Sequence, residues 1–244
     1  MEKETIIEIR NLKKAFGEKE ILKGVDLDLK RGENLGILGK SGTGKSVLTK
    51  CIVRLLDPDE GDIKVLGQDM INISDTQLNE IRTKIGYLFQ GGALYDSMNV
   101  HENLEFPIRR TQMSKDKQEV EHMIEQALKS VGLLDAIYKM PSELSGGMKK
   151  RIGLARALIL KPEIILYDEP TTGLDSVTSG EISELIVKVQ EEYNACSIII
   201  THDMKCAKIT TNRIKILQEG LFYAEGTYDE LSNSKDKDTK AYFI

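Results

Sequence analysis

The sequence predicts an α/β domain built around a mainly parallel sheet. Three short, unbroken apolar runs have the length of strands that are covered on both faces, at residues 35–38, 164–167 and 198–200. Helical patterns lie between these runs, and an alternation of buried strands with helices is typical of a parallel sheet. Val25–Leu29 instead alternates apolar and polar residues, which predicts a half-buried strand of the antiparallel type.

Composition excludes several classes of protein. Among the 244 residues, 40% are hydrophobic and 30% are charged, as in soluble globular domains. No apolar run approaches the ~20 residues that cross a bilayer, and the N-terminus lacks the apolar core of a signal peptide, so we expect neither a membrane span nor secretion. The net charge of -5 disfavours nucleic-acid binding. Three scattered cysteines predict reduced core thiols and no zinc site.

The remaining elements follow from periodicity. Weaker strand signals cover residues 6–10 and 62–66, and a further apolar run covers 85–89. Apolar residues spaced by 3.6 positions predict a helix over 120–131, and helical patterns also cover 47–56, 148–160 and 176–193. Few strand signals occur over residues 95–160, which predicts a helical insert, and the polar end at 232–240 predicts a mobile tail.

A glycine-rich segment follows the first buried strand. It matches the phosphate-loop pattern GxxxxGK[ST], with a strand before it and a helix after it. Glycines let backbone N–H groups surround phosphate oxygens, Lys45 can reach the β- and γ-phosphates, and Ser46 offers a hydroxyl to Mg²⁺. A chance glycine-rich turn is disfavoured by this context. The predicted nucleotide contacts are Gly39, Lys40, Ser41, Gly42, Thr43, Gly44, Lys45, Ser46 and Val47.

An acidic pair, Asp168 and Glu169, ends the strand at 164–167. Charges at the end of a buried strand are costly without partners. We interpret Asp168 as a Mg²⁺ ligand acting through water and Glu169 as the residue that polarises the attacking water. The alternative is a pair of capping acids at a turn, which is disfavoured beside a phosphate loop.

Two further strands end in polar residues. His202 follows the strand at 198–200 and could touch a γ-phosphate, whereas Gln90 follows the strand at 85–89 and could coordinate Mg²⁺ or orient water. Either residue alone would be unremarkable. Ligands bind at the carboxyl ends of parallel strands, so four such groups predict one catalytic edge.

The segment Leu144–Arg151 opens a predicted helix with Ser145, Gly146 and Gly147, a second anion-binding pattern. Three basic residues, Lys149 to Arg151, then occupy the first turn, against the helix dipole. A functional role and simple exposure to solvent explain these three charged residues equally well.

These motifs, in this order, resemble the nucleotide-binding domain of an ABC transporter over residues 5 to about 231. The resemblance implies a P-loop NTPase fold with a RecA-like parallel sheet core, an antiparallel β-subdomain and a helical subdomain. As one domain over 1–244, it would place the core and β-subdomain at 1–94 and 160–231, the helical subdomain at 95–159 and a tail at 232–244. Phe16 is placed like the aromatic residue that stacks on adenine, which is more often Tyr in this family.

The sequences of three segments resemble the ATPase subunits of Mla and other Mce-linked phospholipid transporters: Tyr87–Met98, Leu144–Arg151 and Tyr167–Asp175. Family members often have Pro after the aspartate at 175, where this chain has Ser176. The resemblance implies a permease partner, an Mce-domain substrate-binding protein, and a location on the cytoplasmic face of the inner membrane.

The mechanism implied is hydrolysis of Mg²⁺-ATP in a head-to-tail homodimer. Each ATP would contact the phosphate loop of one chain and Ser145 to Gly147 of the other, with Glu169, His202, Gln90 and Lys45 as the catalytic set and Ser46, Gln90 and Asp168 around Mg²⁺.

Other hypotheses are an ABC ATPase with a different cargo, a non-transport ABC ATPase, a kinase or GTPase, and an inactive cassette. The chain lacks the coiled coils, CxxC insertions and NKxD segment of these classes, and retains Lys45, Asp168, Glu169 and His202.

Overall fold

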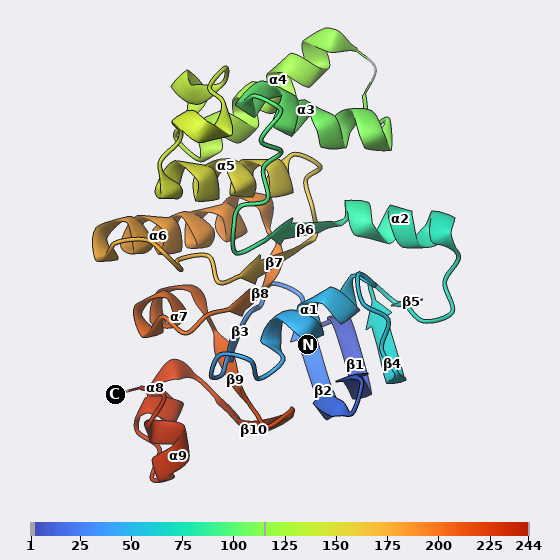
Figure 1. The fold of residues 1–244 in the computed structure, drawn as a ribbon, viewed down its shortest axis with the longest axis vertical. Coiled ribbons are helices and arrows are strands. Elements are labelled where there is room, and N and C mark those ends of the chain that lie inside the picture. The colour runs from blue at the N-terminus through green and yellow to red at the C-terminus, as the bar shows by residue number, and fades with distance from the viewer. Residues whose placement is uncertain (1–2, 115, 244) are drawn as a thin grey trace. The chain divides into compact units, whose positions relative to one another are not determined.

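The computed structural model describes residues 3–114 and 116–243 (Figure 1). The chain divides into two compact units, residues 1–82 with 196–244 and residues 83–195. The predicted helical region 95–159 falls inside the second unit. The finer boundaries at 94, 160 and 231 stay predictions.

The first unit contains a four-stranded antiparallel sheet in the order β2-β1-β4-β5. The strands are β1 (Thr5–Phe16), β2 (Lys19–Lys30), β4 (Glu60–Val65) and β5 (Gln68–Asp69). In β2, Val25, Leu27 and Leu29 are buried and alternate with more exposed residues. This confirms the predicted antiparallel strand with one wet face.

The same unit contains parallel strands, β3 (Asn34–Leu38), β8 (Cys196–Ile200) and β9 (Arg213–Gln218), with β3 between the other two. Every residue of β3 and β8 is buried, as the unbroken apolar runs predict. Helix α1 (Lys45–Ile52) follows β3, and α7 (Met204–Thr210) follows β8. Strands β3 and β8 therefore each present their carboxyl end to a loop that opens a helix.

The second unit pairs β6 (Ile85–Leu88) with β7 (Ile164–Asp168) in parallel, with Leu88 opposite Tyr167. Its helices are α3 (Val100–Thr111), α4 (Lys117–Ser130), α5 (Gly146–Leu158) and α6 (Ser176–Tyr193), besides the 3-10 turns Leu134–Ala136 and Pro141–Glu143. Helix α5 packs against β6 and against α3, α4 and α6. Figure 1 shows α3 and α4 beside α5. Helix α2 (Asp75–Thr83) precedes β6.

Two elements differ from expectation. Helix α1 ends at Ile52, although the pattern predicts a helix to Leu56, because Arg54 has a left-handed backbone (φ 54°) that ends the helical turn. The chain also forms a hairpin between β9 and β10 (Leu221–Gly226), which was not predicted from the sequence. Its turn is Glu219–Gly220, both with positive φ, as a tight hairpin turn requires.

The C-terminal segment also differs from the predicted mobile tail. It contains α8 (Tyr228–Ser232) and the short helix α9 (Lys237–Lys240), visible at the foot of Figure 1. Asp236 caps α9 by accepting hydrogen bonds from the N–H and hydroxyl of Thr239, at 2.8 and 2.6 Å. Tyr242 and Phe243 then pack on a cluster that includes Leu38, so apolar burial after the polar stretch holds this segment.

All three cysteines are unpaired and buried, as expected of core thiols. Burial raises the pKa of the Cys51 thiol to about 11. Among the described residues, no helix has the length and apolarity needed to cross a bilayer.

Candidate functional site

The phosphate loop lies between β3 and α1, as predicted. Gly44 caps α1 with φ 104°, and a Cβ atom there would lie 2.8 Å from Ile21 Cγ2. Backbone conformation and space therefore both demand glycine at this position. Lys45 is 7% exposed, and its Nζ donates to the carbonyl oxygens of Gly39 at 2.8 Å and Lys40 at 3.1 Å. The loop thus holds its own cation at the N-terminus of a helix, a place that favours anions.

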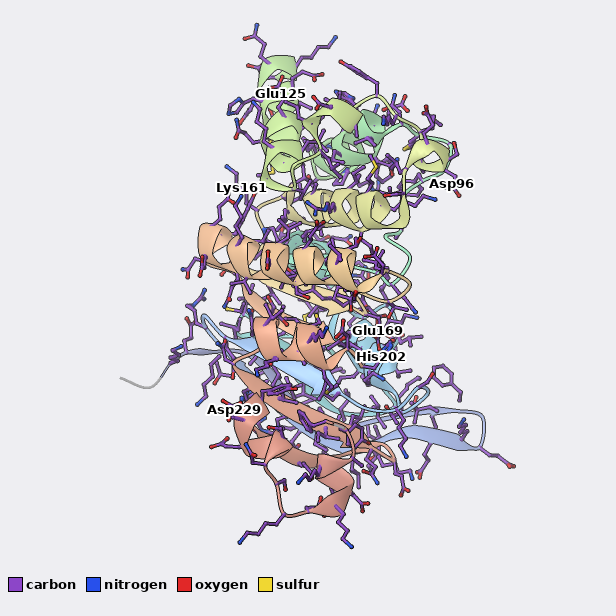
Figure 2. All side chains as sticks on the ribbon, turned by 90° about the vertical axis from the view of Figure 1, so that its left-hand side faces the viewer. Asp96, Glu125, Lys161, Glu169, His202 and Asp229 are labelled. Carbon is purple, nitrogen blue, oxygen red and sulfur yellow. The ribbon has the colours of Figure 1, made fainter. Side chains whose placement is uncertain are left out.

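His202 lies in the turn between β8 and α7, where Figure 2 labels it. The turn is fixed by Asp203, whose N–H donates to Thr201 Oγ1 at 3.0 Å and whose carboxylate caps α7. His202, Gly39 and Lys40 line one pocket of about 290 Å³ in the first unit. The structure therefore brings His202 to the start of the phosphate loop.

Phe16 ends β1 and is 49% exposed, with Lys14 Nζ 5.6 Å from the ring centroid. An exposed aromatic face beside a cation could stack on a purine. Its contact with adenine stays a prediction.

Asp168 and Glu169 stand at the carboxyl end of β7 in the second unit, where Figure 2 labels Glu169. Asp168 is 6% exposed. Glu169 adopts a left-handed backbone with φ 52°, a conformation that costs a non-glycine residue on the order of 1–3 kcal/mol. The Thr172 hydroxyl donates to Glu169 Oε2 at 3.1 Å, a contact that sequence reasoning missed. Strain and a directed carboxylate at one residue are typical of functional sites.

Ser145 caps α5, and its hydroxyl accepts the N–H of Met148 at 3.3 Å. Ser145 and Gly146 are exposed, whereas Gly147 is buried, and a Cβ on it would lie 2.6 Å from Thr178 Cγ2 on α6. The exposed cap is available to a ligand, and the buried glycine lets α5 approach α6.

The three basic residues that open α5 separate into different roles. Arg151 donates to Glu181 Oε2 at 2.6 Å and to the Val131 carbonyl at 3.3 Å. Lys150 is 5% exposed and donates to the carbonyl oxygens of Gln90 and Glu169. Lys149 is half-buried. Lys150 is therefore not a solvated surface charge. In the sequence, its special role was indicated only by its position, since a cation in a first helical turn is unfavourable.

Gln90 is exposed within a tight turn after β6, in which the Gly92 N–H donates to the Phe89 carbonyl at 2.8 Å. The following residues lead along a groove of about 370 Å³ within the second unit. Tyr95 lies in this groove with the Arg156 guanidinium 4.6 Å from its ring centroid, and Arg156 also donates to the Ala93 carbonyl. Arg156, which was not predicted as a functional residue, therefore holds Ala93 and Tyr95 in the segment after Gln90.

The predicted Mg²⁺ ligands are Ser46, Gln90 and Asp168, a hydroxyl, an amide and a carboxylate. Oxygen donors of this kind fit a hard cation that keeps several of its waters. Among residues 3–114 and 116–243, no group of three or more His, Cys, Asp and Glu side chains gathers as a metal cluster. The phosphate loop and His202 belong to the first unit, and Gln90, the acidic pair and Ser145 to the second.

Comparison with known proteins adds to this geometry. Residues 22–172 match the protein family described as ABC transporter. The chain is 44% identical over 211 residues to the probable ribonucleotide transport ATP-binding protein mkl of Mycobacterium leprae, a match that covers 86% of this chain and 60% of that protein. The chain therefore spans well under two thirds of that relative.

Two further relatives are covered over more of their length. The intermembrane phospholipid transport system ATP-binding protein MlaF of Haemophilus influenzae is 38% identical, over 96% of this chain and 88% of its own. The methionine import ATP-binding protein MetN of Clostridium tetani is 36% identical, over 93% and 70%. Relatives named for different cargoes therefore have similar identity to this chain.

A solved structure is also similar. It is the dimeric post-hydrolysis state of the ATP-binding cassette MJ0796 bound to ADP and Pi, with a TM-score of 0.84 and 33% identity over 91% of this chain and 99% of that chain. The fold is thus that of such a cassette, with a mixed, largely parallel core, an antiparallel β-subdomain and helices.

Proposed function

This chain belongs to the ABC transporter family of ATP-hydrolysing cassettes, and from that premise we propose that it is the ATP-binding subunit that powers a separate membrane permease. The observation that carries the proposal is the placement of each motif at the carboxyl end of a buried strand. The phosphate loop and His202 follow β3 and β8, and Gln90 and the acidic pair follow β6 and β7. ATPases of this kind act mainly by positioning and charge stabilisation.

Each residue of the proposed site has a role that its surroundings support. The loop N–H groups and Lys45 would bind the phosphates, and Phe16 would contact the adenine. The Glu169 carboxylate, held by Thr172, would orient the attacking water and accept its proton. His202 would contact the γ-phosphate.

A magnesium ion would be held by Ser46, Gln90 and Asp168. When bound, it would neutralise charge on the β- and γ-phosphates. This donor set is hard, and the low exposure of Asp168 favours a nearby positive charge.

We propose that the working form is a head-to-tail dimer on the cytoplasmic face of a membrane. The similarity to a dimeric cassette supports this arrangement. The exposed Ser145 and Gly146 at the start of α5 would then contact ATP held by the partner chain.

For cargo, we propose phospholipid, in a complex with a permease and an Mce-domain protein. Two observations support this cargo: the amino-acid sequences of the loops at 87–98 and 167–175, and the similarity to MlaF. Methionine import is the second candidate, because the identity to MetN is close to that with MlaF.

Reconstitution with the permease that co-purifies with this chain tests the cargo. Proteoliposomes are assayed for ATP-dependent transfer of labelled phospholipid and, in parallel, for uptake of labelled methionine. Phospholipid transfer supports the assignment. Methionine uptake without lipid transfer replaces it while leaving the ATPase assignment intact.

The groove after Gln90 would receive a short permease helix, because an apolar groove with a polar rim suits helix binding. Tyr95→Ala, which removes the ring held by Arg156 and Phe106, is therefore expected to weaken docking or uncouple transport while MgATP binding by the isolated chain is kept. Leu94→Ser tests the preceding residue, which lies between the groove residues Ala93 and Tyr95 in sequence. Unchanged lipid transfer in both variants would remove this groove from the coupling path.

A further inference from the structure

Lys150 joins two loops that are 79 residues apart in sequence. It lies on the first turns of α5, and its Nζ donates to the Gln90 carbonyl, which follows β6, and at 3.1 Å to the Glu169 carbonyl, which follows β7. The two strands pair in parallel, with Leu88 opposite Tyr167, so both carbonyls lie at the same end of the pair. One amine therefore spans the carboxyl ends of two neighbouring strands.

The contact with Glu169 acts on a strained backbone. The Glu169 carbonyl accepts two hydrogen bonds, from Lys150 Nζ and from the Thr172 N–H at 3.3 Å, while φ at Glu169 is 52°. A left-handed glutamate persists only where surrounding groups fix it, and the orientation of its peptide sets where the carboxylate points. Loss of either donor would release that orientation.

Charge and burial support a specific role for the amine. Burial lowers the pKa of the Lys150 ammonium below its usual value, whereas the negative charges of Glu169 and Asp168 act to raise it. A lysine that is 5% exposed is unfavourable unless its donors are used, and here two of its three donors are bonded to carbonyls.

We infer that Lys150 is a positioning residue for ATP hydrolysis, which holds Glu169 in its catalytic orientation and ties that orientation to the loop of Gln90. The inference rests on the proposed role of Glu169. The Gln90 loop continues into the groove of Tyr95. A movement of this loop would therefore shift the Lys150 amine and, through it, the backbone of Glu169, all within the second unit.

The test uses the 244-residue chain with Lys150→Met, which keeps the length of the side chain and removes its donors. Lys150→Arg keeps the donors, and Lys149→Met is the matched control one residue away. Unfolding temperature, the Kd for a fluorescent ATP analogue, KM and kcat are measured for each. We expect Lys150→Met to lower kcat at least ~10-fold, in the range lost with a catalytic hydrogen-bonding group, and to change Kd less than ~3-fold. Lys150→Arg should recover much of kcat, and Lys149→Met should behave as wild type.

A double-mutant cycle separates positioning from general support of the fold. If Lys150 acts through Glu169, Lys150→Met should cause no further loss in a Glu169→Gln background, since residues that act as a unit are non-additive. An unchanged kcat in Lys150→Met, or equal losses in both backgrounds, would overturn the inference. If Lys150→Met does not fold, Lys150→Gln, whose amide is neutral and too short to span both carbonyls, takes its place under the same criteria.

The two proposals fail separately. Near-normal turnover by Glu169→Gln alone would refute the role of Glu169, whatever Lys150→Met does. A large loss in Glu169→Gln together with normal turnover in Lys150→Met would refute only the positioning role of Lys150.

Discussion

Glu169 combines three features in one residue. It follows a fully buried strand, its backbone is left-handed, and its carboxylate accepts a hydrogen bond from Thr172. The left-handed backbone does not stabilise the fold, since this conformation is costly for any residue with a Cβ. The best explanation for this costly conformation is that it directs the Glu169 carboxylate.

Glu169→Gln should bind MgATP and turn it over very slowly. Glutamine keeps the shape and the hydrogen bond from Thr172 but cannot accept a proton, and loss of a general base costs ~10²–10⁴-fold in rate. Steady-state turnover and nucleotide titration of the same preparation check this. Gel filtration should also show ATP holding the dimer closed in the variant, whereas an active variant would end the assignment.

Gly147→Ala should destabilise the chain by about 1–3 kcal/mol, the usual cost of overpacking. The added Cβ would lie 2.6 Å from Thr178 Cγ2, the methyl group that Thr178→Ser removes. Serine keeps the hydroxyl that donates to Asp175 at 2.6 Å. The double variant should therefore regain most of the lost stability in urea unfolding, and failure of this rescue would locate the cost elsewhere.

At the scale of elements, sequence predicts best where a single period dominates. Helix α6 has the predicted bounds, Ser176–Tyr193, and the apolar runs became β3, β7 and β8. The early end of α1 was not predictable from apolar spacing, because a left-handed residue, Arg54, sets it. The hairpin turn at Glu219–Gly220 does have a signal in the sequence, because Gly220 separates two apolar stretches.

In the candidate site, too, some residues are predictable from local sequence and others are not. The phosphate loop and the acidic pair are contiguous motifs, so their positions follow from local sequence. Lys150 meets Gln90, 60 residues away, and Glu169, 19 residues away. No local pattern distinguishes it from Lys149, because its role depends on tertiary contacts.

One carboxylate, that of Asp236, caps α9. Hydrogen bonds from Thr239 hold the pKa of Asp236 below its usual value, and Tyr223 also donates to it at 3.1 Å. Because the folded pKa is depressed, this contribution to stability is present above the ordinary aspartate pKa and is lost as the pH falls through the folded value. Asp236→Ala should therefore speed hydrogen exchange at the amides of residues 240–243, which bond within this segment. Exchange of α7 is the internal control, and unchanged protection of 240–243 would contradict the cap.

For the whole molecule, the proposed dimer makes each ATP site a composite of two chains. Lys45 and Ser145 of one chain would then serve different sites. A head-to-tail pair can be tested without a structure of the complex, because lesions in the two residues should complement.

Lys45→Ala and Ser145→Arg chains should each be inactive alone. In a mixed dimer, one site carries both lesions and the other carries neither. If each two-fold site works independently, the mixed dimer should return roughly half of wild-type turnover, and an unsorted mixture after random exchange roughly a quarter. Co-expression with two affinity tags isolates the mixed dimer for the assay. Full turnover by a strictly monomeric chain would contradict shared sites.

The burial of Cys51, Cys196 and Cys206 makes the natural chain a ready host for spectroscopy. Burial keeps maleimides away from all three thiols, and because burial also raises the pKa of the Cys51 thiol to about 11, that thiol supplies almost no reactive thiolate at neutral pH. A cysteine introduced at Tyr138, which is 75% exposed, or at Leu221, which is 46% exposed, would thus be labelled selectively without removing any native cysteine. A donor dye at one position and an acceptor at the other would place one probe on each compact unit, so that energy transfer measured with and without nucleotide tests whether the distance between the probes changes.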